Sequence, residues 1–142
     1  MAATEQAITL TKVAAEAAEN KLGKKLIAHD VSEQLAITDV FLLVSASNER
    51  QVSAIVDEIE LQLREQCQVK PVRREGDREN RWVLLDYIDL VVHIQHEEER
   101  GFYALERLWK DTPRIELGDD RGGPDARARP PAAELEGRAG GA

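Results

Sequence analysis

The sequence has only one cysteine, Cys67, and no long run of apolar residues. One thiol cannot form an internal disulfide, and this favours a reducing compartment. We interpret Cys67 as a small, half-buried residue near a helix end. The first thirty residues contain no apolar stretch typical of a signal peptide, and no segment approaches the length of a membrane span. These absences predict a cytoplasmic protein with no membrane partner.

Basic residues are also in short supply, because 19 Lys and Arg stand against 27 Asp and Glu, for a net charge of -8. A protein that binds nucleic acid mainly through phosphates needs a basic surface, since neutralising phosphates and releasing counterions provides much of the affinity. The charge therefore argues against a DNA partner and allows only minor, local contact with RNA. The partner that suits an acidic chain is a basic protein surface.

Two zones of composition divide the 142 residues, whose number suits one domain with a modest core. From about Gly118 onward the sequence turns to Gly, Pro, Ala, Arg and Asp, with almost no large apolar residue. Such a segment cannot offset its ordering entropy by burying apolar surface. We therefore expect one domain over residues 1–117 and a disordered tail over residues 118–142.

Hydrophobic periodicity predicts helices and strands within the domain. Apolar residues at helical spacing, an N-cap at Asn48 and a run of glutamates before a Phe-Tyr pair indicate helices. Runs rich in β-branched and aromatic residues indicate strands, and Pro71 marks an edge strand because proline cannot donate to a sheet ladder. The expected helices are residues 4–22, 48–68 and 97–111, and the expected strands are residues 25–31, 39–47, 69–75 and a hairpin over 81–96.

The hairpin RWVLLDYIDLVVHIQH combines an aliphatic face with a mixed face. Strand residues alternate sides, so the purely apolar positions of the two arms fall on one face, which we expect to pack against the helices. That face holds Val83, Leu85, Tyr87, Leu90, Val92 and Ile94. The opposite face then presents a tryptophan among carboxylates and an imidazole, at Trp82, Leu84, Asp86, Asp89, Val91 and His93.

Catalysis at this mixed face is weakly supported. A nucleotidyltransferase needs a Gly-Ser turn at a helix start and an Asp-x-Asp pair on the next strand to hold magnesium. The sequence has SASN at the corresponding turn, and Asp86 and Asp89 lie three residues apart across a tight turn. His93 and His96 would point to opposite faces of a strand, which disfavours zinc. With no Gly-rich phosphate loop and no base near the one thiol, we expect no catalytic residues, no metal and no cofactor.

Two interpretations of the mixed face remain open from the residues alone. In the first, Asp86 and Asp89 cap a tight turn, His93 is a satisfied half-buried histidine, and Trp82 belongs to the core. In the second, the face is a docking surface, because tryptophan and tyrosine are preferred interface anchors and carboxylates around an apolar patch suit a basic partner. Periodicity does not separate the two.

Two segments resemble the bacterial ribosomal silencing factor family, also called the Iojap-related family. They read ITDVFLLVSASNERQVSAIVDEIE and RWVLLDYIDLVVHIQHEEERGFYALERLW. The resemblance covers about residues 5–117, and the HIQHEEER run and the tail rich in Gly and Arg are typical of an actinobacterial member. It is carried by Asp39, by Ser47, Arg50 and Gln51, by the block Trp-x-x-x-Asp-Tyr-x-Asp-x-x-Val-His, and by the run Phe-Tyr-x-Leu-Glu-x-Leu-Trp.

This resemblance implies a single compact α/β domain with a mixed β-sheet, related to the nucleotidyltransferase fold but without its catalytic residues or activity. Family members bind protein number fourteen of the large ribosomal subunit, which is basic. They block the joining of the large and small subunits and lower translation when nutrients are scarce. Carried over position by position, the docking residues are Trp82, Leu84, Asp86 and Tyr87, with Asp89 and His93 at the margin.

Two other functions stay open as alternatives. The first is a degenerate nucleotidyltransferase-like enzyme, and the second is a homodimeric scaffold that uses the same sheet face on itself. One position also departs from the resemblance, because the family usually has glycine where this chain has Ile88. A two-residue hairpin turn often needs a positive φ, which a β-branched residue resists. We therefore expect either a wider turn or another residue in that conformation.

Overall fold

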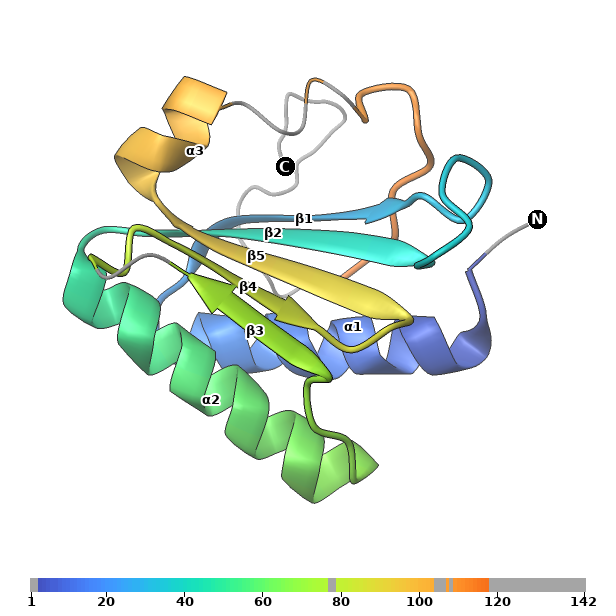
Figure 1. Cartoon of the computed structure of the whole chain (residues 1–142), viewed down its shortest axis with the longest axis horizontal. Coiled ribbons are helices and arrows are strands. Elements are labelled where there is room, and N and C mark those ends of the chain that lie inside the picture. The colour runs from blue at the N-terminus through green and yellow to red at the C-terminus, as the bar shows by residue number, and fades with distance from the viewer. Residues whose placement is uncertain (1–2, 77–78, 104–106, 108, 118–142) are drawn as a thin grey trace.

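Five strands form one mixed sheet in the order β1-β2-β5-β4-β3 (Figure 1). The computed structural model describes residues 3–76, 79–103, 107 and 109–117. The central pair β2/β5 is parallel and the other neighbouring strands are antiparallel, so the expected α/β fold with a mixed sheet is confirmed. The elements are α1 (Glu5–Asn20), β1 (Lys24–Asp30), β2 (Val40–Ala46), α2 (Glu49–Cys67), β3 (Arg73–Gly76), β4 (Trp82–Asp86), β5 (Leu90–His96) and α3 (Glu97–Tyr103).

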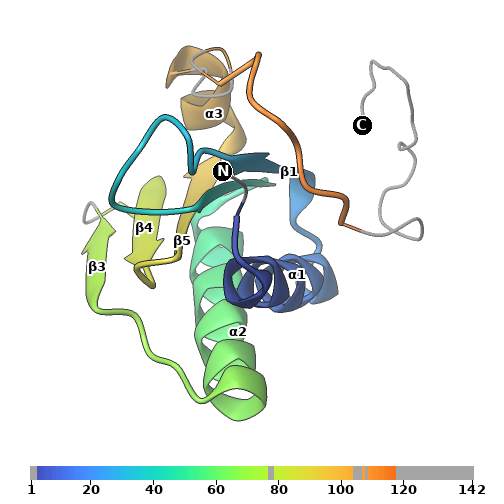
Figure 2. The same cartoon turned by 90° about the vertical axis from the view of Figure 1, so that its right-hand side faces the viewer.

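The two long helices cover one face of the sheet, and α3 lies on the opposite face (Figure 2). Alternate strand residues point toward α1 and α2 and join their apolar residues in one buried cluster. The alternation of the hairpin predicts this face to be the core, and that prediction is confirmed. The residues of β2, β4 and β5 and of the β4–β5 turn in the cluster are Val40, Leu42, Val44, Ala46, Val83, Leu85, Tyr87, Leu90, Val92 and Ile94.

The first helix approaches the sheet closely because alanine forms much of its buried face. The helix begins at a capping threonine, since Thr4 Oγ1 accepts a hydrogen bond from the Ala7 N–H. It ends before Gly23, where an added Cβ would lie 2.9 Å from Val44 and 3.0 Å from the Ala18 carbonyl oxygen. Glycine is therefore required where the end of α1 meets β2.

The second helix begins with the cap that the sequence predicts. Asn48 accepts a hydrogen bond from the Gln51 N–H, and the Gln51 side-chain oxygen accepts one from the Ser47 N–H. The amide nitrogen of Gln51 also donates to the carbonyl oxygens of Lys21 and Leu22, at 2.9 and 3.0 Å. One glutamine thus joins the start of α2 to the end of α1. The apolar residues at helical spacing in α2 form one buried stripe, which comprises Val52, Ile55, Val56, Ile59 and Leu63.

The C-terminal region departs from the predicted helix over residues 97–111. The helix α3 is assigned only to Tyr103, and residues 109–112 form a turn in which the Thr112 N–H and hydroxyl both bond to the Trp109 carbonyl oxygen. The prediction of a helix to residue 111 is wrong because this backbone turns instead toward the edge of the sheet.

After this turn the chain runs along the outer edge of β1. The Asp30 N–H donates to the Pro113 carbonyl oxygen, and the Ile115 N–H donates to the Ala28 carbonyl oxygen. We call residues 109–117 the C-terminal strap. The strap pairs with one end of β1. Its first residues lie on the same side of the sheet as α3 (Figure 2). The strap therefore covers the β1 side of this face and leaves the β4 side without it.

Candidate docking surface

The mixed face of the hairpin lies opposite α1 and α2, as the alternation predicts. In the pairing of β4 with β5, Leu84 stands opposite His93 and Asp86 stands opposite Val91. Trp82, Leu84 and Asp86 are half-buried, whereas the alternating residues of β4 are buried in the helix-covered core. We use the name mixed face for Trp82, Leu84, Asp86, Val91 and His93.

Four aromatic rings form a row across this side of the sheet. The Trp82 Nε1–H donates a hydrogen bond to His93 Nδ1 at 3.2 Å. His93 in turn meets Phe41 edge-on at 5.2 Å between ring centroids, and Phe41 meets Trp109 of the strap edge-on at 5.4 Å. The row fixes the indole of Trp82 at the open end, half-exposed to solvent. Trp82 is therefore neither a core residue under the helices nor a freely moving surface group.

Phe41 is the member of this row that sequence reasoning does not assign to the site. It lies in the strand FLLVSA, where nearly every residue is apolar. An unbroken apolar run is typical of a strand that is buried on both faces, so alternation carries no signal about which residue faces which side. Only the pairing of Phe41 with Val91 across β2 and β5 places it on the mixed side.

The imidazole of His93 is uncharged at neutral pH. Its residue is 7% exposed, and this burial lowers the pKa of His93 to about 4. Because Nδ1 accepts the hydrogen bond from Trp82, the neutral ring carries its proton on Nε2. Protonation would turn Nδ1 into a donor and remove the bond that orients the indole. His93 therefore acts as a support for Trp82 rather than as an exposed contact residue.

The turn between β4 and β5 is narrow and places Ile88 in the conformation that its side chain resists. The Tyr87 N–H donates to the Leu90 carbonyl oxygen, and the Asp89 N–H donates to the Tyr87 carbonyl oxygen at 2.9 Å. Ile88 itself has a φ of 74°. Both expectations for this position, a wider turn or a different residue at positive φ, are wrong. A carboxylate oxygen of Asp86 accepts the Ile88 N–H at 2.8 Å and holds the turn closed.

This conformation is costly for a β-branched residue, by about 1–3 kcal/mol. The Ile88 side chain is also 55% exposed, so its own burial does not offset the cost. The capping role that the first interpretation gives to Asp86 is thus present. Asp89 takes part differently, because its backbone carbonyl oxygen accepts from the N–H groups of Asp39 and Val40, each at 3.2 Å.

Tyr87 does not share the mixed face. Its side chain lies in the core cluster under the helices and is 6% exposed. Burial, with a smaller contribution from the Glu60 carboxylate, raises the pKa of the Tyr87 hydroxyl well above its ordinary value. The structure therefore separates Tyr87 from the other predicted docking residues, because its side chain packs in the core cluster on the helix-covered side of the sheet.

Charged groups fasten the two ends of β4. At its start, the Arg81 guanidinium lies 2.9 Å from a Glu49 carboxylate oxygen and 2.8 Å from one of Glu98, and so links β4 to α2 and α3. At its end, Asp86 lies 3.5 Å from Arg73 of the edge strand β3. The glutamates that open α3 thus serve in ion pairs as well as at the helix start. These contacts hold the mixed face between two fixed ends.

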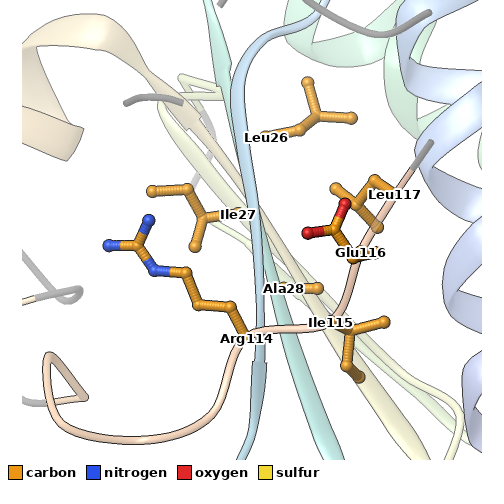
Figure 3. A pocket seen from close by; sticks show the side chains of 7 residues that line it. All are labelled: Leu26, Ile27, Ala28, Arg114, Ile115, Glu116 and Leu117. Carbon is orange, nitrogen blue, oxygen red and sulfur yellow. The ribbon is translucent and has the colours of Figure 1, made fainter. Parts of the chain in front are cut away.

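A hollow of about 140 Å³ lies elsewhere, between β1 and the C-terminal strap (Figure 3). Ile27 and Arg114 point to one side of β1, and Leu26 and Leu117 point to the other. Leu26, Ile115 and Leu117 pack against the core cluster. The hollow is therefore a seam where the strap meets the edge of the sheet.

The part of the chain that the structure describes holds neither a cluster of metal-binding side chains nor a membrane-spanning helix. Within residues 3–76, 79–103, 107 and 109–117, no three His, Cys, Asp or Glu side chains gather where they could hold a metal ion. His96, one member of the pair weighed for zinc, accepts a hydrogen bond at Nδ1 from the Glu98 N–H at 3.1 Å. Over the same part of the chain, no helix has the length and apolar character needed to cross a bilayer.

Comparisons with known proteins agree with the fold and the motifs. A family model described as "Ribosomal silencing factor during starvation" matches residues 4–140, and so extends beyond residue 117, where the resemblance was expected to end. A Bacillus subtilis protein named "Ribosomal silencing factor RsfS" is 40% identical over 110 residues, which are 77% of this chain and 92% of that protein. "Mitochondrial assembly of ribosomal large subunit protein 1" of Mus musculus is 30% identical over 81 residues, which are 56% of this chain and 36% of that protein.

A solved structure supports the same assignment. The crystal structure of a Chromobacterium violaceum protein superposes with a TM-score of 0.69 and 31% identity, covering 80% of this chain and 94% of that one. Three findings therefore agree on the family: the match of the family model over most of the chain, the relative at 40% identity and the shared fold. The chain belongs to the ribosomal silencing factor family.

Proposed function

We propose that this protein represses translation by binding the large ribosomal subunit through its basic protein number fourteen. Bound there, it obstructs the joining of the small subunit when nutrients are limiting. The observation that carries the proposal is the half-exposed indole of Trp82, held by His93 on the part of the sheet that the helices α1 and α2 leave open. A ribosomal partner places the protein in the cytoplasm.

The negative charge of the chain and the names of its relatives support a basic protein of the large ribosomal subunit as the partner. The chain carries a net charge of -8. Asp86 lies on the mixed face at the opposite end of β4 from Trp82, and Asp89 belongs to the turn that follows it. A negatively charged rim suits a basic protein and speeds the encounter with it. The names of the relatives describe a silencing factor and an assembly protein of a ribosomal large subunit. They describe regulation rather than catalysis, and the proposal needs no reaction.

Obstruction requires only an interface and enough copies of the protein. A small protein bound at the subunit junction competes with the small subunit by mass action, so the extent of repression follows its affinity and concentration. A standard interface of about 1,600 Å² in total, centred on one buried aromatic anchor, supports sub-micromolar binding. Trp82, Leu84 and Asp86 of the mixed face, together with Asp89, form the proposed centre of that interface, and His93 supports the indole from behind.

Co-sedimentation with separated large and small ribosomal subunits in sucrose gradients tests the proposal. The protein should travel with large subunits, not with small ones, and should reduce the formation of joined ribosomes. Trp82→Ala should weaken binding by about 2 kcal/mol, which is about thirtyfold, because it removes the anchor. Its thermal unfolding should stay close to that of the wild type, since the indole is half-exposed.

A matched control removes the second indole. Trp109 stands at the other end of the aromatic row, on the strap, and Trp109→Ala should change the affinity by less than about threefold. Equal binding of wild type and Trp82→Ala would place the docking surface elsewhere. Sedimentation of the protein alone could show a stable dimer. If that dimer persists when large subunits are added, the result would favour the homodimeric scaffold instead.

A further inference from the structure

Large apolar side chains are exposed mainly at one end of the sheet. Among the residues that the structure describes, the large apolar side chains with high exposure are Leu22, Ile37, Val72 and Ile88, at 73%, 80%, 63% and 55%. Three of them belong to segments at the right-hand end in Figure 1: the loop between β1 and β2, the approach to β3, and the β4–β5 turn. Leu22 alone lies at the opposite end, between α1 and β1.

These three segments are joined by hydrogen bonds and do not merely share a direction. The Val72 N–H donates to the Asp86 carbonyl oxygen at 2.8 Å, which ties the approach to β3 to the end of β4. The Asp39 N–H donates to the Asp89 carbonyl oxygen at 3.2 Å, which ties the β1–β2 loop to the same turn. The segments that carry Ile37 and Val72 therefore flank the turn that carries Ile88. We call Ile37, Val72 and Ile88 the apolar end.

The fold itself gives no reason for isoleucine at position 88. Its φ of 74° is a conformation that glycine and asparagine adopt readily and that a β-branched side chain resists. More than half of the side chain faces solvent, so it contributes little to the core. Strain that is kept in an exposed position is typical of residues that serve recognition.

We infer that the apolar end extends the mixed face and inserts, through Ile88, into an apolar patch on the basic protein that this chain binds. The inference rests on the proposed function. Its chemistry follows from the surroundings, because the Asp86 carboxylate accepts the Ile88 N–H at 2.8 Å and Asp89 follows Ile88 in the chain. An apolar centre with an acidic rim fits an apolar patch bordered by lysine or arginine.

The test replaces Ile88 by asparagine, which tolerates the left-handed conformation and removes the apolar tip. Ile88→Asn should raise the melting temperature and at the same time raise the Kd for large subunits about tenfold. Ile88→Val keeps the strain and most of the apolar surface, so its Kd should stay within about threefold of the wild type. A residue with a merely structural role would not combine greater stability with weaker binding.

Leu22 provides the matched control. It is exposed, apolar and at a φ of 66°, but lies at the other end of the sheet. Leu22→Asn should raise the melting temperature in the same way and leave the Kd unchanged. If Trp82→Ala loses binding while Ile88→Asn binds like the wild type, the apolar end is refuted and the proposed function stands. If the wild type does not bind large subunits, both fail together.

Discussion

The two faces of the sheet are made by the same strands but differ in chemistry. The face toward α1 and α2 is aliphatic apart from Tyr87, and its strand residues are buried in one cluster. The opposite face combines buried polar groups with half-exposed ones. The buried polar residues of its strands are His29, Ser45, His93 and Gln95, and Trp82, Leu84 and Asp86 are half-buried beside them.

The polar groups of the second face do not stabilise the fold as aliphatic residues would. Neither side-chain polar atom of Gln95 finds a hydrogen-bond partner among the residues that the structure describes, although the residue is 0% exposed. Such burial costs about 1–3 kcal/mol for an unpaired group. A chain that keeps these residues gives up stability on one side of its sheet, as functional surfaces commonly do. The comparison assigns stability mainly to the helix-covered face, which leaves the other face available for the proposed interface.

The largest expected effect is the difference in the free energy of unfolding between alanine substitutions of two leucines, one on each face. Leu42 is 0% exposed under the helices, and Leu42→Ala should lower the free energy of unfolding by about 3 kcal/mol because it leaves a cavity. Leu84 is half-buried on the mixed face, and Leu84→Ala should lower it by less than about 1 kcal/mol. Urea denaturation measures both. In binding of the folded fraction to large subunits, Leu84→Ala should lose more affinity than Leu42→Ala. Equal effects of the two variants in both assays would contradict the proposed difference between the faces.

A second effect, of about the same size, concerns pH and the support of Trp82. The folded protein holds the pKa of His93 near 4, below its value of about 6.5 in the unfolded chain. Between these values the unfolded state binds more protons, so stability is complete above pH 6.5 and falls as the pH drops through 4. A difference of this size corresponds to about 3 kcal/mol. Thermal unfolding between pH 4 and pH 7.5 measures it.

The control for this prediction replaces the titrating ring. His93→Asn keeps an acceptor for the Trp82 indole but has no proton to gain, so its stability should change less with pH than that of the wild type over this window. The wild type should also bind large subunits less tightly as the pH approaches 4 than at pH 7.5, because protonation near that pH removes the bond from Trp82 Nε1–H to His93 Nδ1. Parallel pH curves for the two proteins would show that His93 is not the titrating support.

Sequence patterns predict the helix-covered face far better than the mixed face, for physical reasons. The alternation of Val83, Leu85, Leu90, Val92 and Ile94 depends only on the period of a strand, and the structure places all five as predicted. The aromatic row depends on contacts between distant segments that no local period records. The most distant of these is the contact of Trp109 with Phe41, 5.4 Å between ring centroids.

The β4–β5 turn shows a different limit. Local preference argues against a positive φ at Ile88, but the Asp86 carboxylate and the pairing of Tyr87 with Leu90 impose it. Tertiary and side-chain contacts thus override propensity at this residue, which borders the candidate interface. The predicted helix over residues 97–111 is too long for a related reason. The hydrogen bond from the Ile115 N–H to the Ala28 carbonyl oxygen holds the strap at the edge of the sheet.

The smallest expected effect tests the charge of the recognition face. Asp89 is the better residue for this than Asp86, because the Asp86 carboxylate holds the turn through the Ile88 N–H, whereas Asp89 contributes its backbone carbonyl oxygen. Asp89→Lys inverts a charge that should face a basic partner and should weaken binding by about 1 kcal/mol at 50 mM salt. At 500 mM salt the loss should shrink toward zero, because the Debye length falls from about 14 Å to about 4 Å. Asp89→Asn should show about half the effect with the same salt dependence. A loss that is equal at both salt concentrations would mean that the substitution disturbs the turn, and the acidic rim would then have no part in the interface.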